Sequence, residues 1–240
     1  MNALAIIGSS SLAKLSEFVI HRRQVVRTPY GLSDSPLLFG KIGDCDVVLL
    51  VRQGLNHTLS PEAINYRANI WALKEVGAKQ ILSVSSVCAL QENTLPVGDL
   101  VLPHDLIDYT SGRADTFADG RQEVQYTDFR QPYAADLREK IMNLAPQIHQ
   151  QAVYACIQGT RLPTGAEIRR MHNDGADVYG MTGMPEAVLA RELHLAYVHV
   201  CGIVGAGAVG ESPFTSSNPH HATVMGKIRD LLLQISALSS

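Results

Sequence analysis

Several features are missing from this chain of 240 residues, and each absence excludes a class of protein. The sequence has only four cysteines, and no two of them form a CxxC pair: Cys45, Cys88, Cys156 and Cys201. Metal or redox roles for them are not expected, and reduced thiols are typical of a cytoplasmic protein. No apolar run approaches the roughly 18 residues that a membrane helix needs. Positions 1–8 lack the charged segment of a signal peptide, so we expect no export signal.

Charge is sparse and nearly balanced, with 20 Lys and Arg against 23 Asp and Glu, for a net charge of −3. Because no basic run stands out, neither a nucleic acid nor a membrane surface is an expected partner. The sequence contains no GxGxxG or Walker loop, so a dinucleotide-binding protein is the most remote alternative. The apolar content of 46% predicts a single domain with a sizeable core, spanning residues 1–240.

Short apolar segments alternate with helical patterns along the chain. The expected strands are 3–7, 46–51, 80–84, 99–102, 153–157, 177–181 and 196–204. Helices are predicted from Ser60 to Gly77, from Thr182 to Leu193, from 137 to about 145, and over 224–238. Residues 110–131 are polar and form a long excursion, and loops of that length are often functional. The alternation predicts an α/β fold in three layers.

The most informative segment is Tyr179–Glu192, where a strand passes into a helix. Thr182 stands where an N-cap would stand, Pro185 suits an early helical position, and Glu186 suits the first turn. A hydroxyl and free backbone N–H groups at a helix N-terminus form an anion site. By itself, such a junction is more often an ordinary connection between a strand and a helix.

Two further strand ends carry groups suited to an oxyanion. The first strand runs into a Gly/Ser turn at 8–12, whose N–H groups and hydroxyls suit a phosphate, although such a turn is often only a turn. Arg52 leaves a buried strand and presents a bidentate fork to an oxyanion, or is an ordinary surface arginine. If Ser10, Arg52 and Thr182 bind phosphate together, their side chains converge on one pocket.

Several motifs together resemble the trimeric purine nucleoside phosphorylases, nearest to the methylthioadenosine and methylthioinosine phosphorylase branch. Residues 181–186 are similar to the family's Met-Thr-x-x-Pro-Glu motif, 65–77 match almost residue for residue, and 105–113 resemble the methylthioinosine branch. The resemblance covers about residues 3–235. It implies a nucleoside-phosphorylase-like three-layer sandwich around a mixed central β-sheet, assembled as a homotrimer.

The resemblance also implies which residues bind the substrates. Those that would hold phosphate are Ser10, Arg52, Gln53, Ser85, Ser86 and Thr182. Those that would contact the nucleoside are Met181 at the ribose hydroxyls, Leu162 and Pro163 near the base or sugar, and Gly205, Ala206 and Gly207 near the leaving purine. Leu162 and Tyr126 would make the 5′ end apolar. No protein nucleophile, metal or organic cofactor is implied, because phosphate itself attacks C1′.

Four positions depart from the family pattern. Gln53 replaces a histidine, Cys88 a glycine and Thr160 a proline. Gly205 stands where relatives carry an Asp for 6-aminopurines or an Asn for 6-oxopurines. Losing one such donor costs roughly 10²–10³ in rate, unless Ser212, Asn218 or a backbone N–H group replaces it.

The reaction implied by the resemblance is phosphorolysis of a purine nucleoside, 5′-methylthioinosine or a related 6-oxopurine nucleoside, to free purine and (methylthio)ribose 1-phosphate. Two alternatives from other classes remain open. In a nucleoside hydrolase, water would replace phosphate, which predicts turnover without phosphate. A binding or structural paralogue would keep the fold and the trimer but not the chemistry.

Overall fold

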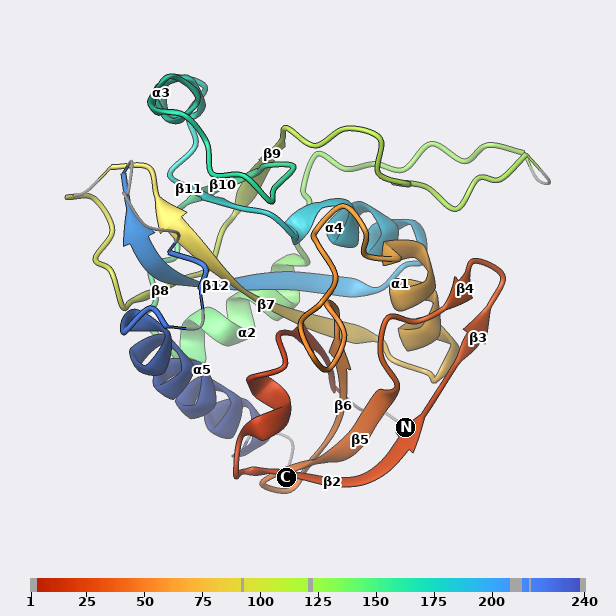
Figure 1. Cartoon of the computed structure of the whole chain (residues 1–240). Helices are drawn as coiled ribbons and strands as arrows, with labels where there is room; N and C mark the ends of the chain where they lie inside the picture. Colours follow the sequence, from red (N-terminus) through yellow and green to blue (C-terminus); the bar gives the residue numbers. More distant parts are fainter. Residues whose placement is uncertain (1–3, 92, 121–122, 208–212, 216, 238–240) are drawn as a thin grey trace.

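The structure is a computed structural model that describes residues 4–91, 93–120, 123–207, 213–215 and 217–237 (Figure 1). The strands in these ranges are β1 (Leu4–Gly8), β2 (Phe18–Gln24), β3 (Arg27–Thr28), β4 (Gly31–Leu32), β5 (Leu37–Ile42), β6 (Cys45–Val51), β7 (Gln80–Ala89), β8 (Leu100–Val101), β9 (Asp105–Asp108), β10 (Val153–Cys156), β11 (Val178–Gly180) and β12 (Ala196–Ala206). The helices are α1 (Tyr66–Glu75), α2 (Ala135–Leu144), α3 (Gly165–Asn173), α4 (Gly183–Glu192) and α5 (His220–Ala237), with a short 3-10 helix at Leu12–Lys14.

The central sheet is mixed, as the resemblance implied. Its main path runs β2-β5-β6-β1-β7-β11-β10-β9, and β12 pairs with both β7 and β8. At the centre, β6, β1, β7 and β12 are parallel neighbours, whereas β11 meets the end of β7 in antiparallel register. The hairpin of β2 and β5 adds an antiparallel edge. The carboxyl ends of β1, β6 and β7 therefore open on the same side of the sheet.

Helices cover both faces of this sheet, which gives the three-layer sandwich (Figure 1). One core lies under α1 and α4 and includes Ile70 and Leu189. The other lies under α2 and α5 and includes Ile141 and Ile228. These apolar helix faces recur at the spacing of an amphipathic helix, which explains why the sequence pattern indicated α2, α4 and α5.

The first helix begins later than the sequence predicted. It starts at Tyr66 rather than at Ser60, and the side chain of Asn65 caps it by accepting a hydrogen bond from Ala68 N. Asp34 holds this start in place, because its carboxylate accepts from Asn65 N and from the Asn69 amide. The predicted N-cap at Ser60 was wrong because an Asn with a nearby carboxylate partner provides the better cap.

All of the expected strands are present, with differences at their ends. The strand expected at 80–84 continues to Ala89, because it pairs with β11 beyond the point where β1 ends. The strand expected at 99–102 is reduced to β8. Sequence periodicity missed β2 because it is an edge strand whose side chains His21, Arg22 and Arg23 are exposed. Charged side chains are common on edge strands, where they discourage pairing with other chains.

The long excursion is an irregular segment between β9 and α2 that runs out from the body of the molecule in Figure 1. Its base is tied down, since the Glu192 carboxylate accepts from Phe117 N and Thr116 Oγ1. Tyr30, Trp71 and Phe117 form a cluster of three aromatic rings beside it. Among the described residues, no helix combines the length and apolar character required to cross a lipid bilayer.

Candidate active site

Arg52 and Thr182, two of the predicted phosphate-binding residues, lie together where β6 ends and α4 begins. In the register of the sheet, Gly8 at the end of β1 lies beside Val51 at the end of β6. The next residue, Arg52, donates its backbone N–H to Gly8 O at 3.1 Å. Its Nη1 atom lies 3.4 Å from Thr182 Oγ1. The predicted convergence of Arg52 and Thr182 is therefore present.

Arg52 is buried within the protein instead of presenting an open fork to solvent. Its side chain is 3% exposed, and its Nε donates to Glu186 Oε1 at 2.6 Å. Nη2 donates to Ser83 Oγ at 2.7 Å and Nη1 donates to Val84 O at 2.9 Å. Every nitrogen of the guanidinium already has a partner, and Nη1 donates to both Val84 O and Thr182 Oγ1. A bound phosphate would therefore meet Arg52 at Nη1 only by replacing Thr182 Oγ1, which is the longer of these two contacts.

The Glu186 carboxylate neutralises Arg52 and joins it to the rest of a buried polar cluster, defined here as Arg52, Ser83, Glu186 and Tyr197. Oε2 of Glu186 accepts from Ser83 Oγ at 2.8 Å and from Tyr197 OH at 3.0 Å. Burial works against the charged form of Arg52, but the adjacent carboxylate outweighs it, and the net pKa of Arg52 is raised. The cluster fixes α4 to the sheet as an internal, fully paired unit.

Thr182 occupies the N-cap position of α4, but its side chain does not cap the helix. The hydroxyl of Tyr154 accepts from the backbone N–H groups of Thr182 and Gly183, at 3.3 and 3.2 Å. Met184 and Pro185 have non-helical backbone angles, so the first turn of α4 is kinked. The Thr182 hydroxyl is left free of the cap and lies 3.4 Å from Nη1 of Arg52.

The three predicted serines lie on or after the central strands β1 and β7. Ser10 is half-buried in the turn after β1. Ser85 and Ser86 are half-buried on β7, inside the strand rather than in a loop after it. Ser85 Oγ lies 2.7 Å from His199 Nε2 on the neighbouring strand β12. Because the ion pair of Arg52 and Glu186 carries no net charge, an anion at this site would depend on hydroxyls and backbone N–H groups for its polar contacts.

Gln53 takes a different part from the one expected. Its side-chain Nε2 donates to Leu59 O at 3.2 Å, and its backbone carbonyl accepts from Thr58 N and Leu59 N. The amide thus closes its own loop at 53–59. The structure places Gln53 next to Arg52 in sequence but shows its side chain in a loop contact.

Met181 packs against Gly159, in the 158–163 segment that the resemblance places beside the nucleoside. A Cβ atom built on Gly159 would lie 2.6 Å from Met181 Sδ, so only glycine permits this contact. The half-buried Leu162 and Pro163 follow in the same segment. Arg113 holds the arrangement together, since its guanidinium donates to Met181 O at 2.9 Å and to Gln158 O at 2.7 Å.

The region predicted for the leaving purine has no room at position 205 for the Asp or Asn side chain of the family pattern. A Cβ atom on Gly205 would lie 2.9 Å from Pro213 Cβ and 3.2 Å from Cys88 Sγ. Burial raises the pKa of the Cys88 thiol to about 12, so it stays neutral. Ala206 continues β12, and Gly207 has a positive φ of 64° as its N–H bonds to Ala89 O. Glycine at 205 is therefore built into the packing.

Asn218 and Ser212 were the side chains expected to replace the hydrogen-bond donor that is missing at position 205. Asn218 is not available as expected, because its Nδ2 donates to Val204 O and Pro213 O, both at 2.8 Å, and its Oδ1 accepts from His220 N. Ser212 lies outside the described residues. Tyr126 is 96% exposed, so within its own subunit it does not form a wall of a 5′ pocket, contrary to expectation.

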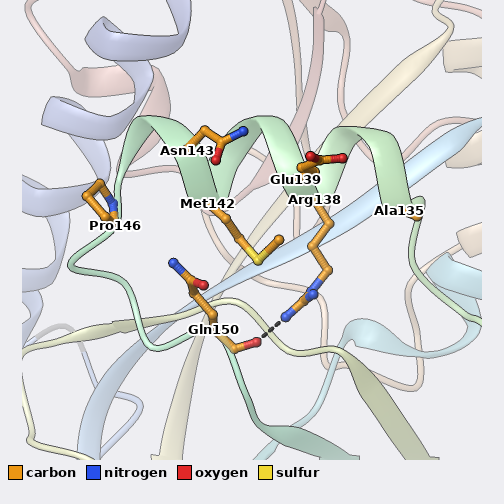
Figure 2. Close-up of a pocket in the computed structure, with 7 residues that line it drawn as sticks. All are labelled: Ala135, Arg138, Glu139, Met142, Asn143, Pro146 and Gln150. Atoms are coloured by element: carbon orange, nitrogen blue, oxygen red, sulfur yellow. Dashed lines mark hydrogen bonds between the residues drawn. The ribbon is translucent and has the colours of Figure 1, made fainter.

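A pocket on the outer face of α2 lies apart from these residues. It is lined by Ala135, Arg138, Glu139, Met142, Asn143, Pro146 and Gln150 (Figure 2). Arg138 is committed to backbone carbonyls at its floor, including those of Gln150 and Pro103. The pocket opens beside α2. The predicted site residues lie elsewhere: Arg52 follows β6, Ser85 is in β7, and Thr182 precedes α4.

Comparison with known proteins shows the family of this chain. The family model described as Phosphorylase superfamily matches residues 3–235. The chain belongs to the phosphorylase superfamily. A probable S-methyl-5'-thioinosine phosphorylase of Pseudomonas syringae pv. tomato is 42% identical over 248 aligned positions, covering 100% of both chains. The 6-oxopurine nucleoside phosphorylase of Pyrococcus furiosus is 38% identical, covering 87% of this chain and 81% of its own.

Solved structures of the superfamily agree with the fold. The crystal structure of a methylthioadenosine phosphorylase from an Antarctic soil metagenomic library has a TM-score of 0.90 at 31% identity, covering 99% of this chain and 87% of that one. The methylthioadenosine phosphorylase of Schistosoma mansoni has a TM-score of 0.86 at 27% identity, with 99% and 91% covered. The predicted nucleoside-phosphorylase-like fold is confirmed.

Sequence reasoning missed three residues that organise the site: Glu186, His199 and Arg113. For Glu186 there was a signal, because an Arg that leaves a buried strand needs a carboxylate partner, and Glu186 lies in the motif beside Thr182. His199 sits inside an apolar run, and nothing in that pattern indicated its contact with Ser85. Arg113 belongs to a matched segment, but its reach to Met181 depends on the folded path of the chain.

Proposed function

We propose that this member of the superfamily catalyses phosphorolysis of purine nucleosides, with a preference for 5′-methylthioinosine or a related 6-oxopurine nucleoside. The observation that carries the proposal is the 3.4 Å contact between Arg52 Nη1 and Thr182 Oγ1, made beside β7, where Ser85 directly follows the Val84 carbonyl that accepts from Arg52. The names of the relatives support the same reaction, since they are S-methyl-5'-thioinosine and 6-oxopurine nucleoside phosphorylases. The products are the free purine and (methylthio)ribose 1-phosphate.

The site needs no protein nucleophile for this reaction. Phosphate attacks C1′ as the bond to the purine breaks. The residues that hold this phosphate are Ser10, Ser85, Ser86 and Thr182, with Nη1 of Arg52 behind it. The sugar becomes oxocarbenium-like, and the adjacent anion stabilises that charge. Met181 holds the ribose, while Arg113 fixes Met181 and the 158–163 segment in position. Alignment of the reactants is the main contribution of the protein.

The preference for 6-oxopurines rests on the packing at Gly205. The site has no Asp there to accept a hydrogen bond from a protonated N7, and Pro213 occupies the space for one. A 6-oxopurine carries an O6 acceptor that a backbone N–H group can satisfy. Without a side chain that can hydrogen-bond to N7, turnover is expected to be slower than in a relative that has one, by roughly 10²-fold or more.

The proposal is tested by measuring release of free base from inosine, methylthioinosine and methylthioadenosine, each with and without phosphate. We expect release that requires phosphate and that favours the two 6-oxopurine nucleosides. Equal release in the absence of phosphate indicates a hydrolase. Cleavage of methylthioadenosine alone contradicts the preference, and no release from any of the three favours a paralogue without catalysis.

We further propose that the enzyme works as a homotrimer in the cytoplasm. Exposed apolar side chains on the long excursion support an assembly, since Val124 is 56% and Tyr126 96% exposed. Residues 65–77, which include α1, resemble a subunit-packing helix of the trimeric purine nucleoside phosphorylases. The free cysteines Cys45, Cys88, Cys156 and Cys201 are all buried thiols, which fits a reducing compartment.

A further inference from the structure

His199 is a buried polar residue in contact with a predicted phosphate-binding serine. It lies on β12 opposite Ser83 of β7, and its side chain is fully buried. Its Nε2 lies 2.7 Å from Ser85 Oγ. The ring of Tyr154 packs edge-on against the imidazole at 4.8 Å, and a Cβ atom on Gly183 would lie 3.1 Å from Nδ1. Packing therefore fixes the ring with Nε2 facing Ser85.

The other ring nitrogen determines where the proton of the imidazole lies. Nδ1 of His199 has no hydrogen-bond partner among the described residues. In a neutral imidazole, one nitrogen donates and the other accepts. A proton on Nδ1 would leave a buried N–H donor unpaired, which folded proteins avoid more strictly than an unused acceptor. The proton therefore belongs on Nε2, which donates to Ser85 Oγ.

The imidazole stays neutral in this environment. Burial, assisted by the positive charge of Arg52, lowers the pKa of His199 to about 3. A neutral ring with its proton on Nε2 uses one lone pair of the Ser85 oxygen and leaves the hydroxyl proton of Ser85 available. The nearest acceptor for that proton is Cys201 Sγ at 3.9 Å from Ser85 Oγ. Because sulfur is a weak acceptor, a phosphate oxygen would replace it readily.

We propose that His199 is a positioning residue for phosphate: by donating from Nε2 to Ser85 Oγ, it turns the Ser85 hydroxyl into an obligate donor toward the bound anion. This inference rests on the phosphate site of the proposed function. It assigns the orientation of the Ser85 hydroxyl to a residue outside the motifs that the sequence indicated. His199 contacts no substrate and acts only through Ser85.

The test compares two substitutions at the same position. His199→Gln keeps an N–H donor at nearly the place of Nε2, whereas His199→Phe keeps the ring and loses the donor. Affinity for inorganic phosphate is measured by calorimetry on the free enzyme, and KM values for phosphate and methylthioinosine are measured separately. We expect His199→Phe to weaken phosphate binding about tenfold, His199→Gln to stay within about twofold of wild type, and the nucleoside KM to change little.

A double-mutant cycle with Ser85→Ala separates positioning from general packing. If His199 acts through Ser85, the effect of His199→Phe on phosphate affinity disappears in the Ser85→Ala background. An equal loss in both backgrounds, or a His199→Phe enzyme with wild-type phosphate affinity, overturns the proposal. Should His199→Phe fail to fold, His199→Asn takes its place, since the shorter amide does not reach Ser85.

The same calorimetry distinguishes this inference from the proposed function. Wild-type enzyme that does not bind phosphate contradicts the proposed phosphate site itself. Wild-type enzyme that binds phosphate, with variants that bind it equally well, contradicts only the role of His199. Because the affinity is read without a nucleoside, the outcome does not depend on the rate of turnover.

Discussion

At the scale of single residues, the pairing of Arg52 with Glu186 decides whether the site forms at all. Both side chains are almost completely buried, at 3% and 2% exposed, and they share hydrogen bonds with Ser83 and Tyr197. A buried ion pair adds little net stability compared with apolar packing, but removing one partner leaves an uncompensated charge. The pair is therefore a point of vulnerability that links α4 to the strand ends.

We expect Glu186→Gln to lower the free energy of unfolding by about 3–5 kcal/mol, because it leaves the Arg52 charge buried without a counter-ion. Chemical denaturation of the purified variant measures this loss. Asp46→Asn is the control, since Asp46 pairs with Lys41 at the surface, and exposed pairs contribute about 0–1 kcal/mol. Similar small losses in both variants contradict the role assigned to Glu186.

His199 adds a pH dependence to stability. Its pKa in the folded protein is about 3, below the ordinary value of 6.5. Between these values the unfolded chain binds a proton that the folded chain excludes, so the free energy of unfolding is complete above pH 6.5 and falls as the pH drops toward 3. Between pH 7 and pH 5, wild type should lose about 2 kcal/mol more than His199→Gln. Parallel guanidinium titrations at the two pH values measure the difference, and equal losses contradict a depressed pKa.

At residue scale, the sequence predicted which residues lie at the strand ends better than it predicted their contacts. The placement of Arg52 and Thr182 at strand ends followed from the pattern of strands, and the structure brings them within 3.4 Å although β1 and β7 lie between β6 and β11 in the sheet. The exposure of Arg52 and the direction of the Gln53 amide did not follow, because both depend on partners distant in sequence, such as Glu186, or on a loop that closes on itself. Local residue types do not contain that information.

At the scale of elements, the ends of β7 and β12 shape the predicted purine region. Both strands run further than periodicity indicated, to Ala89 and Ala206, and their tips pack against Pro213. Cys88 and Gly205 are register partners there. The two departures from the family pattern are therefore one feature, in which a bulkier residue on one strand is matched by the absence of a side chain on the other.

We expect Gly205→Ala to destabilise the protein by about 1–3 kcal/mol, because the added methyl meets Pro213 and Cys88 at less than ordinary contact distance. Gly226→Ala is the matched control. Gly226 lies in α5, where an added methyl would have nothing within 4 Å, and alanine there should stabilise the helix by up to about 1 kcal/mol. Thermal unfolding of both variants measures these changes. If Gly205→Ala leaves the stability unchanged, the strand ends have space for a methyl group and the account of this packing is wrong.

Element boundaries depended on caps and pairing partners. Helix α3 was not predicted from the sequence, although its start at Gly165 has a capping box formed by Thr164 and Glu167, a local signal that is visible in sequence. The start of α1 at Tyr66 depends on Asp34, a partner about 30 residues away. Edge strand β2 lacks the apolar alternation that a buried strand shows, and so it was found only in the structure.

At the scale of the whole molecule, the long excursion between β9 and α2 is where the proposed homotrimer is most readily tested. Its base is bonded to α4 through Glu192 and Arg191, while Tyr126 further along is almost fully exposed. Light scattering of the purified protein at micromolar concentration is expected to give the mass of three chains of 26.1 kDa. A monomer at that concentration rules out the homotrimer.

The three-layer architecture was predictable because alternating strands and helices of apolar character allow few arrangements. The detailed site was less predictable, because it combines Ser85, Thr182 and Arg52 with partners such as His199 that no motif marks. The superfamily match over residues 3–235 fixes the fold. The reaction depends on whether the described cluster binds phosphate beside a nucleoside.

The most direct test of this account is to identify the sugar product by phosphorus NMR after incubation with methylthioinosine and phosphate. The account predicts a new sugar 1-phosphate signal that appears at the same rate as free hypoxanthine, and its loss when Thr182→Val removes the hydroxyl beside Arg52. Release of hypoxanthine with free methylthioribose and no phosphorylated sugar would contradict it.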